Sequence, residues 1–219
     1  MVGQQPKEES RRTEENREVK MTRKEITKFL TDLLISDRLS DRKYYAREVT
    51  LDYGTMEAKR IDIMQFCPLG VTYTSDIEKG YFVCYEVKSC IQDVYSGNGL
   101  NFYGEKNYIV TTIDTYKSLL DDIQTGKLQK HICDFMGIKK CPYFGIMVPV
   151  PKKLNVRDTD AMHSELENPT ELGSGNGWKI WTAYPQKREN YRTRSMNELL
   201  FCMLRSKHNT TNSSTILSP

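Results

Sequence analysis

Six apolar runs with strand chemistry constrain the fold of this 219-residue chain more than any other feature of its sequence. Each run is short and rich in Val, Ile, Tyr and Phe, the residues that fit a pleated sheet. The runs occupy residues 44–51, 60–66, 81–88, 108–112, 143–150 and 178–181. Because the first three runs are joined by short connections, we expect these strands to form an antiparallel meander.

Three further segments carry apolar residues at spacings of three and four, which is the pattern of an amphipathic helix. The first, over 22–36, begins with Thr22 and Glu25 in the T-x-x-E arrangement of a capping box. The second ends at Gly126, and the third is marked by apolar residues over 196–204. Strands and helices in this order predict an α/β (α+β) layered domain with a mixed central sheet flanked by helices.

Polar segments bound this domain at both ends. Residues 1–20 are rich in Gln, Glu, Lys and Arg and hold few apolar side chains, so they cannot offset the entropy lost on ordering. We predict a disordered charged arm over 1–20, a single domain over 21–206 and a disordered polar tail over 207–219. Residues 152–177 include a Gly-rich stretch and are expected to form a long polar loop.

Hydropathy argues against a membrane protein. The mean hydropathy is −0.62, and no run approaches the roughly 18 apolar residues that a membrane span requires. The polar, charged start of the chain lacks the pattern of a signal peptide. We therefore expect no membrane partner and a cytoplasmic location.

The formal net charge of +3 is distributed unevenly along the chain. Residues 1–24 sum to +2 and residues 186–208 to +4, which leaves −3 for the body between them. An acidic body with basic ends favours an anionic partner such as nucleic acid, although basic tails also promote solubility.

The six cysteines include no C-x-x-C pair, and without a secretory signal they are expected to be reduced thiols. His131, Cys133 and Cys141 form the best zinc-like cluster, but a fourth ligand is missing. We favour the alternative that they are small or apolar residues between a helix and a strand.

Three charged residues in the strand-like runs carry the clearest chemistry. Asp62 lies between two isoleucines, and Glu86 and Lys88 occur in another apolar run. Because residues two apart on a strand share a face, Glu86 and Lys88 project together, and Asp62 joins them if the two strands are neighbours. Mg²⁺ prefers oxygen ligands, which Asp62, Glu86 and the Val87 carbonyl supply, while Lys88 can assist an attacking water.

A surface ion pair is the common explanation for a Glu-x-Lys triplet. Here, however, the charges lie in two otherwise apolar runs, where burying them is costly unless they serve a purpose. The pattern therefore favours a divalent-metal site that acts on phosphodiesters.

The order helix, strand, strand with Asp62, strand with Glu86-Val87-Lys88 resembles the core of the PD-(D/E)xK nuclease superfamily over residues 22–150. The segment at 86–94, the run at 108–110 and the late basic helix are similar to the MmcB-like DNA-repair nucleases. This resemblance implies a restriction-endonuclease-like sheet, a Mg²⁺ or Mn²⁺ cofactor bound by Asp62 and Glu86, a water-assisting Lys88, and DNA as substrate.

The resemblance also implies a further acid near the metal, usually from the first helix. Glu25 is the candidate, although it is equally placed to be the capping partner of Thr22. Glu48 on the first strand is the alternative. Ser89 and Asp93 could contact substrate or support the metal ligands, or Asp93 could cap the turn after the strand.

Three basic residues are candidates for contacting DNA, namely Lys106, Arg192 and Arg194, since phosphates are usually bound by Lys and Arg. The alternative is that they are solvated surface residues. The predicted function is a metal-dependent DNA nuclease acting in DNA repair or phage DNA processing. A catalytically silent nuclease-fold protein that binds DNA or a protein is the alternative, and the oligomeric state is left open, with a homodimer as one option.

Overall fold

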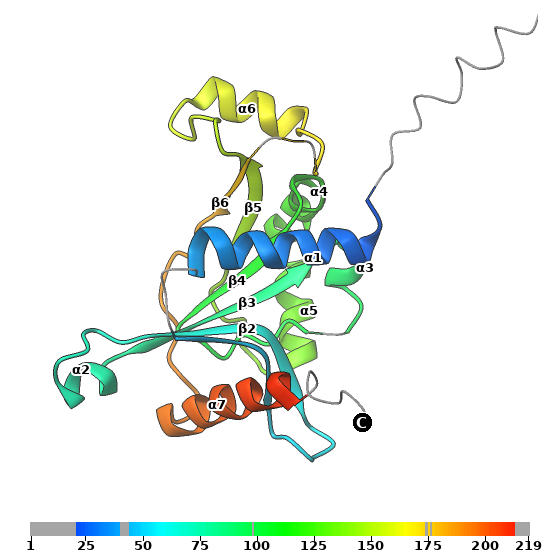
Figure 1. Ribbon diagram of the computed structural model, residues 1–219. Coiled ribbons are helices and arrows are strands. Elements are labelled where there is room, and N and C mark those ends of the chain that lie inside the picture. The colour runs from blue at the N-terminus through cyan, green and yellow to red at the C-terminus, as the bar shows by residue number, and fades with distance from the viewer. Residues whose placement is uncertain (1–20, 40–43, 98, 174, 176, 213–219) are drawn as a thin grey trace, which may run out of the picture.

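A six-stranded mixed sheet organises the fold (Figure 1). The computed structural model describes residues 21–39, 44–97, 99–173, 175 and 177–212. The strands are β1 (Tyr45–Leu51), β2 (Lys59–Cys67), β3 (Tyr81–Lys88), β4 (Lys106–Thr111), β5 (Gly145–Pro151) and β6 (Trp178–Tyr184), in that spatial order. β1, β2 and β3 are antiparallel, β3, β4 and β5 are parallel, and β6 is antiparallel to β5. The predicted α/β class and the meander are confirmed, and the arrangement is consistent with a restriction-endonuclease-like fold.

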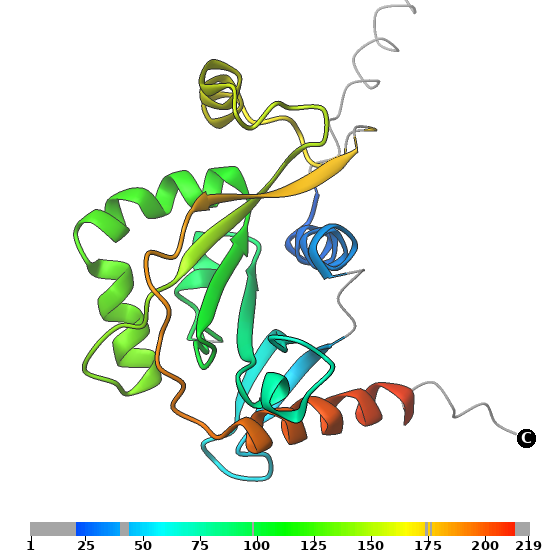
Figure 2. The same ribbon diagram turned by 90° about the vertical axis from the view of Figure 1, so that its left-hand side faces the viewer.

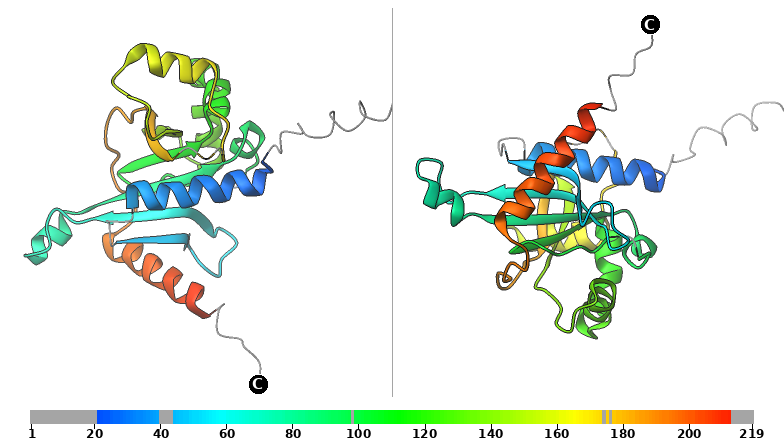
Figure 3. Two further views of the ribbon diagram at one scale, coloured as in Figure 1. Left: turned by 45° about the horizontal axis from the view of Figure 1, so that its top comes forward. Right: turned by 90° about the horizontal axis from the view of Figure 1, so that it is seen from below.

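Helices cover both faces of the sheet. They are α1 (Arg23–Leu34), the π-helix η2 (Ile35–Leu39), α2 (Thr74–Glu78), α3 (Ile91–Val94), α4 (Ile113–Gln124), α5 (Lys127–Met136), α6 (Thr159–Glu167) and α7 (Met196–Asn212). Figure 2 shows α1 on one side of the sheet and α4 and α5 on the other. α7 packs along β1 (Figure 3). No helix in the described ranges is long and apolar enough to cross a membrane.

Successive side chains of β3 point alternately to the two faces of the sheet. Tyr85 and Val87 are buried in the core that includes Leu30 and Leu34 of α1. Cys84 is buried in a second core, against α7. Since successive side chains on a strand point to opposite faces, Glu86 and Lys88 share the Cys84 face, away from α1.

The first helix begins as its sequence predicts. Thr22 Oγ1 accepts a hydrogen bond from the backbone N–H of Glu25, and the Glu25 carboxylate accepts one from the backbone N–H of Thr22 at 2.7 Å. This capping box satisfies N–H groups that have no partner within the helix.

Two expectations about polar segments need correction. The segment 152–177 is not a loop throughout, because it contains α6, which is capped by Asp158 and buries Met162. Its apolar positions are too sparse to give a clear helical pattern. At the carboxyl end, α7 continues to Asn212, into the segment expected to be a tail. The predicted arm over 1–20 and the remaining tail over 213–219 lie outside the described residues.

Candidate active site

Asp62 and Glu86 are brought together on neighbouring strands. β2 and β3 pair with Ile63 opposite Tyr85, so the next residue on each strand places Asp62 across from Glu86. Asp62 Oδ2 accepts a hydrogen bond of 2.8 Å from the backbone N–H of Val87. This bond holds the Asp62 carboxylate beside the Glu-x-Lys segment.

Glu86 and Lys88 are buried, whereas Asp62 is partly exposed. The exposed fraction is 0% for Glu86 and 4% for Lys88. Glu86 Oε1 accepts a hydrogen bond of 3.1 Å from the backbone N–H of Asn101. Glu86 Oε2 has no hydrogen-bond partner within the described part of the chain. A buried carboxylate oxygen without a donor is costly, and it therefore indicates a site that receives a further group.

The electrostatics of the pair support this interpretation. Burial raises the pKa of Glu86 well above its usual value, and the negative charge of Asp62 raises it further. The positive charge of Lys88 acts in the opposite direction but does not outweigh these two effects. Two adjacent carboxylates with a single ammonium beside them favour either a bound proton or a bound cation.

Gly99 covers this group of side chains. A Cβ atom on Gly99 would lie 2.9 Å from Glu86 Oε2, 3.4 Å from Lys88 Nζ and 3.8 Å from Asn101 Nδ2. These three side chains therefore converge on one small volume that only glycine leaves free. With two carboxylates as donors, the residues present fit a hard divalent cation such as Mg²⁺ or Mn²⁺.

Asn101 is the site residue that the sequence interpretation missed. It is 2% exposed, and its Nδ2 donates a hydrogen bond of 2.7 Å to the Arg60 carbonyl on β2. The Gly-rich segment before it predicts only a turn, and nothing local in the sequence connects that turn to Glu86.

Neither proposed further acid joins the site through a recorded contact. The Glu25 carboxylate is held by the backbone N–H and hydroxyl of Thr22, and these bonds lower its pKa. Glu48 has an exposed side chain, a φ of +52° and a weak ion pair of 3.9 Å with Arg60. Capping therefore explains Glu25, and Glu48 faces solvent.

Ser89 and Asp93 interact with each other at the end of β3. Asp93 Oδ2 accepts hydrogen bonds from the Ser89 backbone N–H at 2.9 Å and from its hydroxyl at 3.2 Å. These bonds fix the chain just beyond Lys88, but they do not cap α3, whose N-cap is Cys90 and has no side-chain cap bond.

The three basic residues expected to contact DNA are ion-paired within the protein. Lys106 Nζ lies 3.2 Å from Glu189 Oε1, and Arg192 Nη1 lies 3.3 Å from Glu105 Oε1. Arg194 makes two hydrogen bonds to Asp52. Lys106 is the first residue of β4 and pairs with Val83 of β3, so it lies several residues along the sheet from Glu86.

No group of three or more His, Cys, Asp or Glu side chains able to hold a metal is found among the residues that the structure describes. His131 packs edge-on against Tyr95, at 4.8 Å between ring centroids. Cys141 lies beside Cys133, and burial together with this neighbour raises its pKa to about 12. The zinc hypothesis therefore gains no structural support, and all six cysteines are free thiols.

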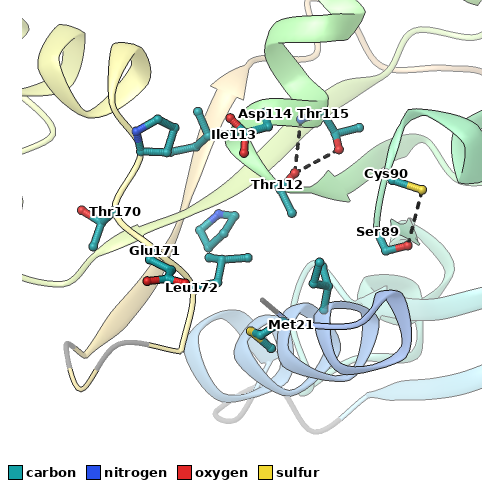
Figure 4. A pocket seen from close by; sticks show the side chains of 13 residues that line it. Met21, Ser89, Cys90, Thr112, Ile113, Asp114, Thr115, Thr170, Glu171 and Leu172 are labelled. Atoms are coloured by element: carbon teal, nitrogen blue, oxygen red, sulfur yellow. Dashed lines mark hydrogen bonds between the residues drawn. The ribbon is translucent and has the colours of Figure 1, made fainter. Parts of the chain in front are cut away.

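A cavity of about 530 Å³ lies next to the end of β3 (Figure 4). Ser89 and Cys90 form one wall, the start of α4 at Thr112 another, and Ile26 of α1 and Leu172 close it. The lining of this cavity is mainly apolar, and it does not include Glu86, Lys88 or Asn101.

No family model, curated protein or solved structure matches the chain.

Proposed function

We propose that this chain is a metal-dependent DNA nuclease that hydrolyses phosphodiester bonds, with Asp62, Glu86 and Lys88 as its catalytic residues. The single observation that carries the proposal is the pair of opposed carboxylates on β2 and β3, one of them with a buried oxygen that has no hydrogen-bond donor among the described residues. The resemblance to the PD-(D/E)xK superfamily and the basic ends of the chain favour DNA as the substrate.

Asp62, Glu86 and the Val87 carbonyl would hold Mg²⁺ or Mn²⁺. When bound, such an ion activates water and offsets the charge that develops on the phosphate. Lys88 Nζ, held beside Glu86, is placed to orient the attacking water and to stabilise negative charge. Asp62, the partly exposed member, would form the side from which substrate approaches.

Arg60 extends the proposed substrate surface. It precedes Asp62 by two residues on β2, and its side chain is 62% exposed. Because residues two apart share a face, its guanidinium lies on the side of the sheet where a phosphate would approach Asp62. The free thiols fit a reducing compartment such as the cytoplasm.

Plasmid and linear DNA incubated with the purified protein and Mg²⁺ or Mn²⁺ test the proposal. We expect cleavage by the wild type and a loss of at least about 100-fold in Asp62→Asn, because one anionic ligand is removed. Asp52→Asn is the matched control, since Asp52 pairs with Arg194 away from the carboxylate pair. Cleavage that persists in Asp62→Asn would refute the assignment.

One observation favours a catalytically silent protein as the second candidate. Glu86 is fully buried and Lys88 nearly so, which is unusual for groups that must reach a scissile phosphate. A silent protein would bind DNA in a salt-dependent manner without any metal requirement. Fluorescence anisotropy of labelled DNA, with and without EDTA, separates the two candidates.

A further inference from the structure

Two buried oxygen atoms near the Glu-x-Lys strand have no hydrogen-bond donor within the described residues, and they belong to Glu86 and Asn101. Glu86 Oε2 is one and Asn101 Oδ1 is the other. Their residues are in direct contact, since the Asn101 backbone N–H donates to Glu86 Oε1. An unpaired buried acceptor costs free energy, and because these two acceptors belong to residues in contact, one bound group could satisfy both.

The position of Asn101 is fixed from two sides. Its backbone is tied to Glu86 on β3, and its Nδ2 donates to the Arg60 carbonyl on β2. Because Nδ2 is already used as a donor, Oδ1 is left as the acceptor of the amide. Asn101 therefore bridges the two strands that carry Asp62 and Glu86, through its side chain to β2 and its backbone N–H to β3.

We propose that Asn101 Oδ1 supplies the third side-chain oxygen ligand of the divalent-cation site, beside Asp62, Glu86 and the Val87 carbonyl, in the place that Glu25 or Glu48 was expected to fill. This inference rests on the proposed function and adds a ligand to it. Amide oxygens are ordinary ligands of hard cations. The neutral amide also avoids a third negative charge beside two carboxylates that already repel each other.

Isothermal titration of the metal-free full chain with Mn²⁺ tests the proposal without reference to activity. We expect Asn101→Ala to weaken Mn²⁺ binding by at least about tenfold, because an oxygen ligand is lost. Asn101→Asp keeps an oxygen and adds a charge, so its affinity should equal or exceed that of the wild type. Thermal unfolding should show a larger stabilisation by Mn²⁺ in Asn101→Asp than in Asn101→Ala.

Asn107→Ala is the matched control for a purely structural amide. Asn107 is also fully buried, but its side chain exchanges hydrogen bonds with Gly104 through both Oδ1 and Nδ2. Its loss should lower the melting temperature and leave Mn²⁺ affinity within about twofold of the wild type. If Asn101 had only a structural role, Asn101→Ala would likewise lower the melting temperature and leave Mn²⁺ affinity within about twofold of the wild type, and the proposal would be overturned.

The outcomes separate this inference from the proposed function. If the wild type binds Mn²⁺, Asp62→Asn does not, and both Asn101 variants bind like the wild type, Asn101 is not a ligand and the nuclease proposal stands. If Asn101→Asp loses binding as fully as Asn101→Ala, the oxygen is not what matters and the inference is again overturned. If the wild type binds no Mn²⁺ at all, the proposed metal site itself is wrong.

Discussion

Two glutamate carboxylates, one beside each end of β3, differ in their hydrogen-bond and ion-pair partners: Glu86 belongs to β3, whereas Glu105 immediately precedes β4 and reaches the start of β3. At the amino-terminal end, Glu105 Oε2 accepts from the Phe82 backbone N–H and Oε1 pairs with Arg192. At the carboxyl-terminal end, Glu86 accepts a hydrogen bond from one donor in the described part of the chain, the Asn101 backbone N–H, and its charged neighbours include another carboxylate, Asp62. A carboxylate with its partners in place stabilises the fold, whereas a fully buried carboxylate that lacks a partner for one oxygen indicates a candidate functional site.

The largest effect expected from this contrast is on catalysis. Lys88→Met should lower the cleavage rate by about 10²–10⁴-fold, because a group placed to assist the water and stabilise charge is removed. Lys106→Met, near the other end of β3, should change the rate at saturating DNA by less than about threefold. Single-turnover cleavage measures both variants, and equal losses would remove the distinction between the two ends.

Metal affinity should show the next largest effect, through the two glycines of the turn before Asn101. Gly97 and Gly99 have similar φ angles, +73° and +77°, so alanine costs similar backbone strain at each. Only at Gly99 would the new Cβ meet Glu86 Oε2 and Lys88 Nζ. We expect Gly99→Ala to weaken Mn²⁺ binding by about tenfold or more and Gly97→Ala to leave it unchanged, as measured by calorimetry.

If both glycine variants lose Mn²⁺ affinity equally, strain in the turn rather than the space beneath Gly99 controls binding. If neither loses affinity, the convergence under Gly99 is not the metal site.

The strand that carries Glu86 and Lys88 could be predicted from sequence because its signals are local. Alternation of apolar residues placed both charged side chains on one face, and the short linkers predicted the pairing that sets Asp62 opposite Glu86. The capping box of α1 is likewise local, and the alternative interpretation of Glu25 as a capping residue agrees with its contacts.

Contacts between distant segments could not be predicted in the same way. Asn101 reaches Arg60 across 41 residues of sequence, and Asn190 accepts from the Tyr143 backbone across 47. The same limit applies to the pairs Arg192–Glu105 and Arg194–Asp52, whose members lie far apart in the chain, whereas the second partner of Arg194, Glu198, is only four residues away. The positive charge of both arginines is visible in the sequence, but the distant carboxylates that pair with them are not.

A smaller effect is expected on stability, where Glu86→Gln should stabilise the metal-free protein. The pKa of Glu86 is raised in the folded state, so its contribution to stability is present at low pH and is lost as pH rises through that raised pKa. Each unit of elevation corresponds to about 1.4 kcal/mol. Glutamine keeps an acceptor for the Asn101 backbone N–H but cannot ionise. The variant should therefore lack the decline in unfolding free energy that the wild type shows as pH rises.

Urea unfolding of the metal-free wild type and Glu86→Gln between pH 5 and 9 measures this difference. The two stability curves should converge at low pH and separate as pH rises, with the variant more stable. Saturating Mn²⁺ should stabilise only the wild type, and a parallel pair of curves would contradict the raised pKa.

The smallest effect is expected for Glu105→Gln, and its sign should be opposite. Glutamine keeps an acceptor for the Phe82 backbone N–H but loses the charge that pairs with Arg192 at 3.3 Å. Because both side chains are mostly buried, we expect a loss of about 1–2 kcal/mol in unfolding free energy, with Mn²⁺ affinity unchanged. In a double-mutant cycle with Arg192→Met, the double variant should lose less unfolding free energy in total than the sum of the two single losses, since both variants remove one shared interaction. If Glu105→Gln instead stabilised the protein, as Glu86→Gln is expected to do, the proposed difference between the two carboxylates would be contradicted.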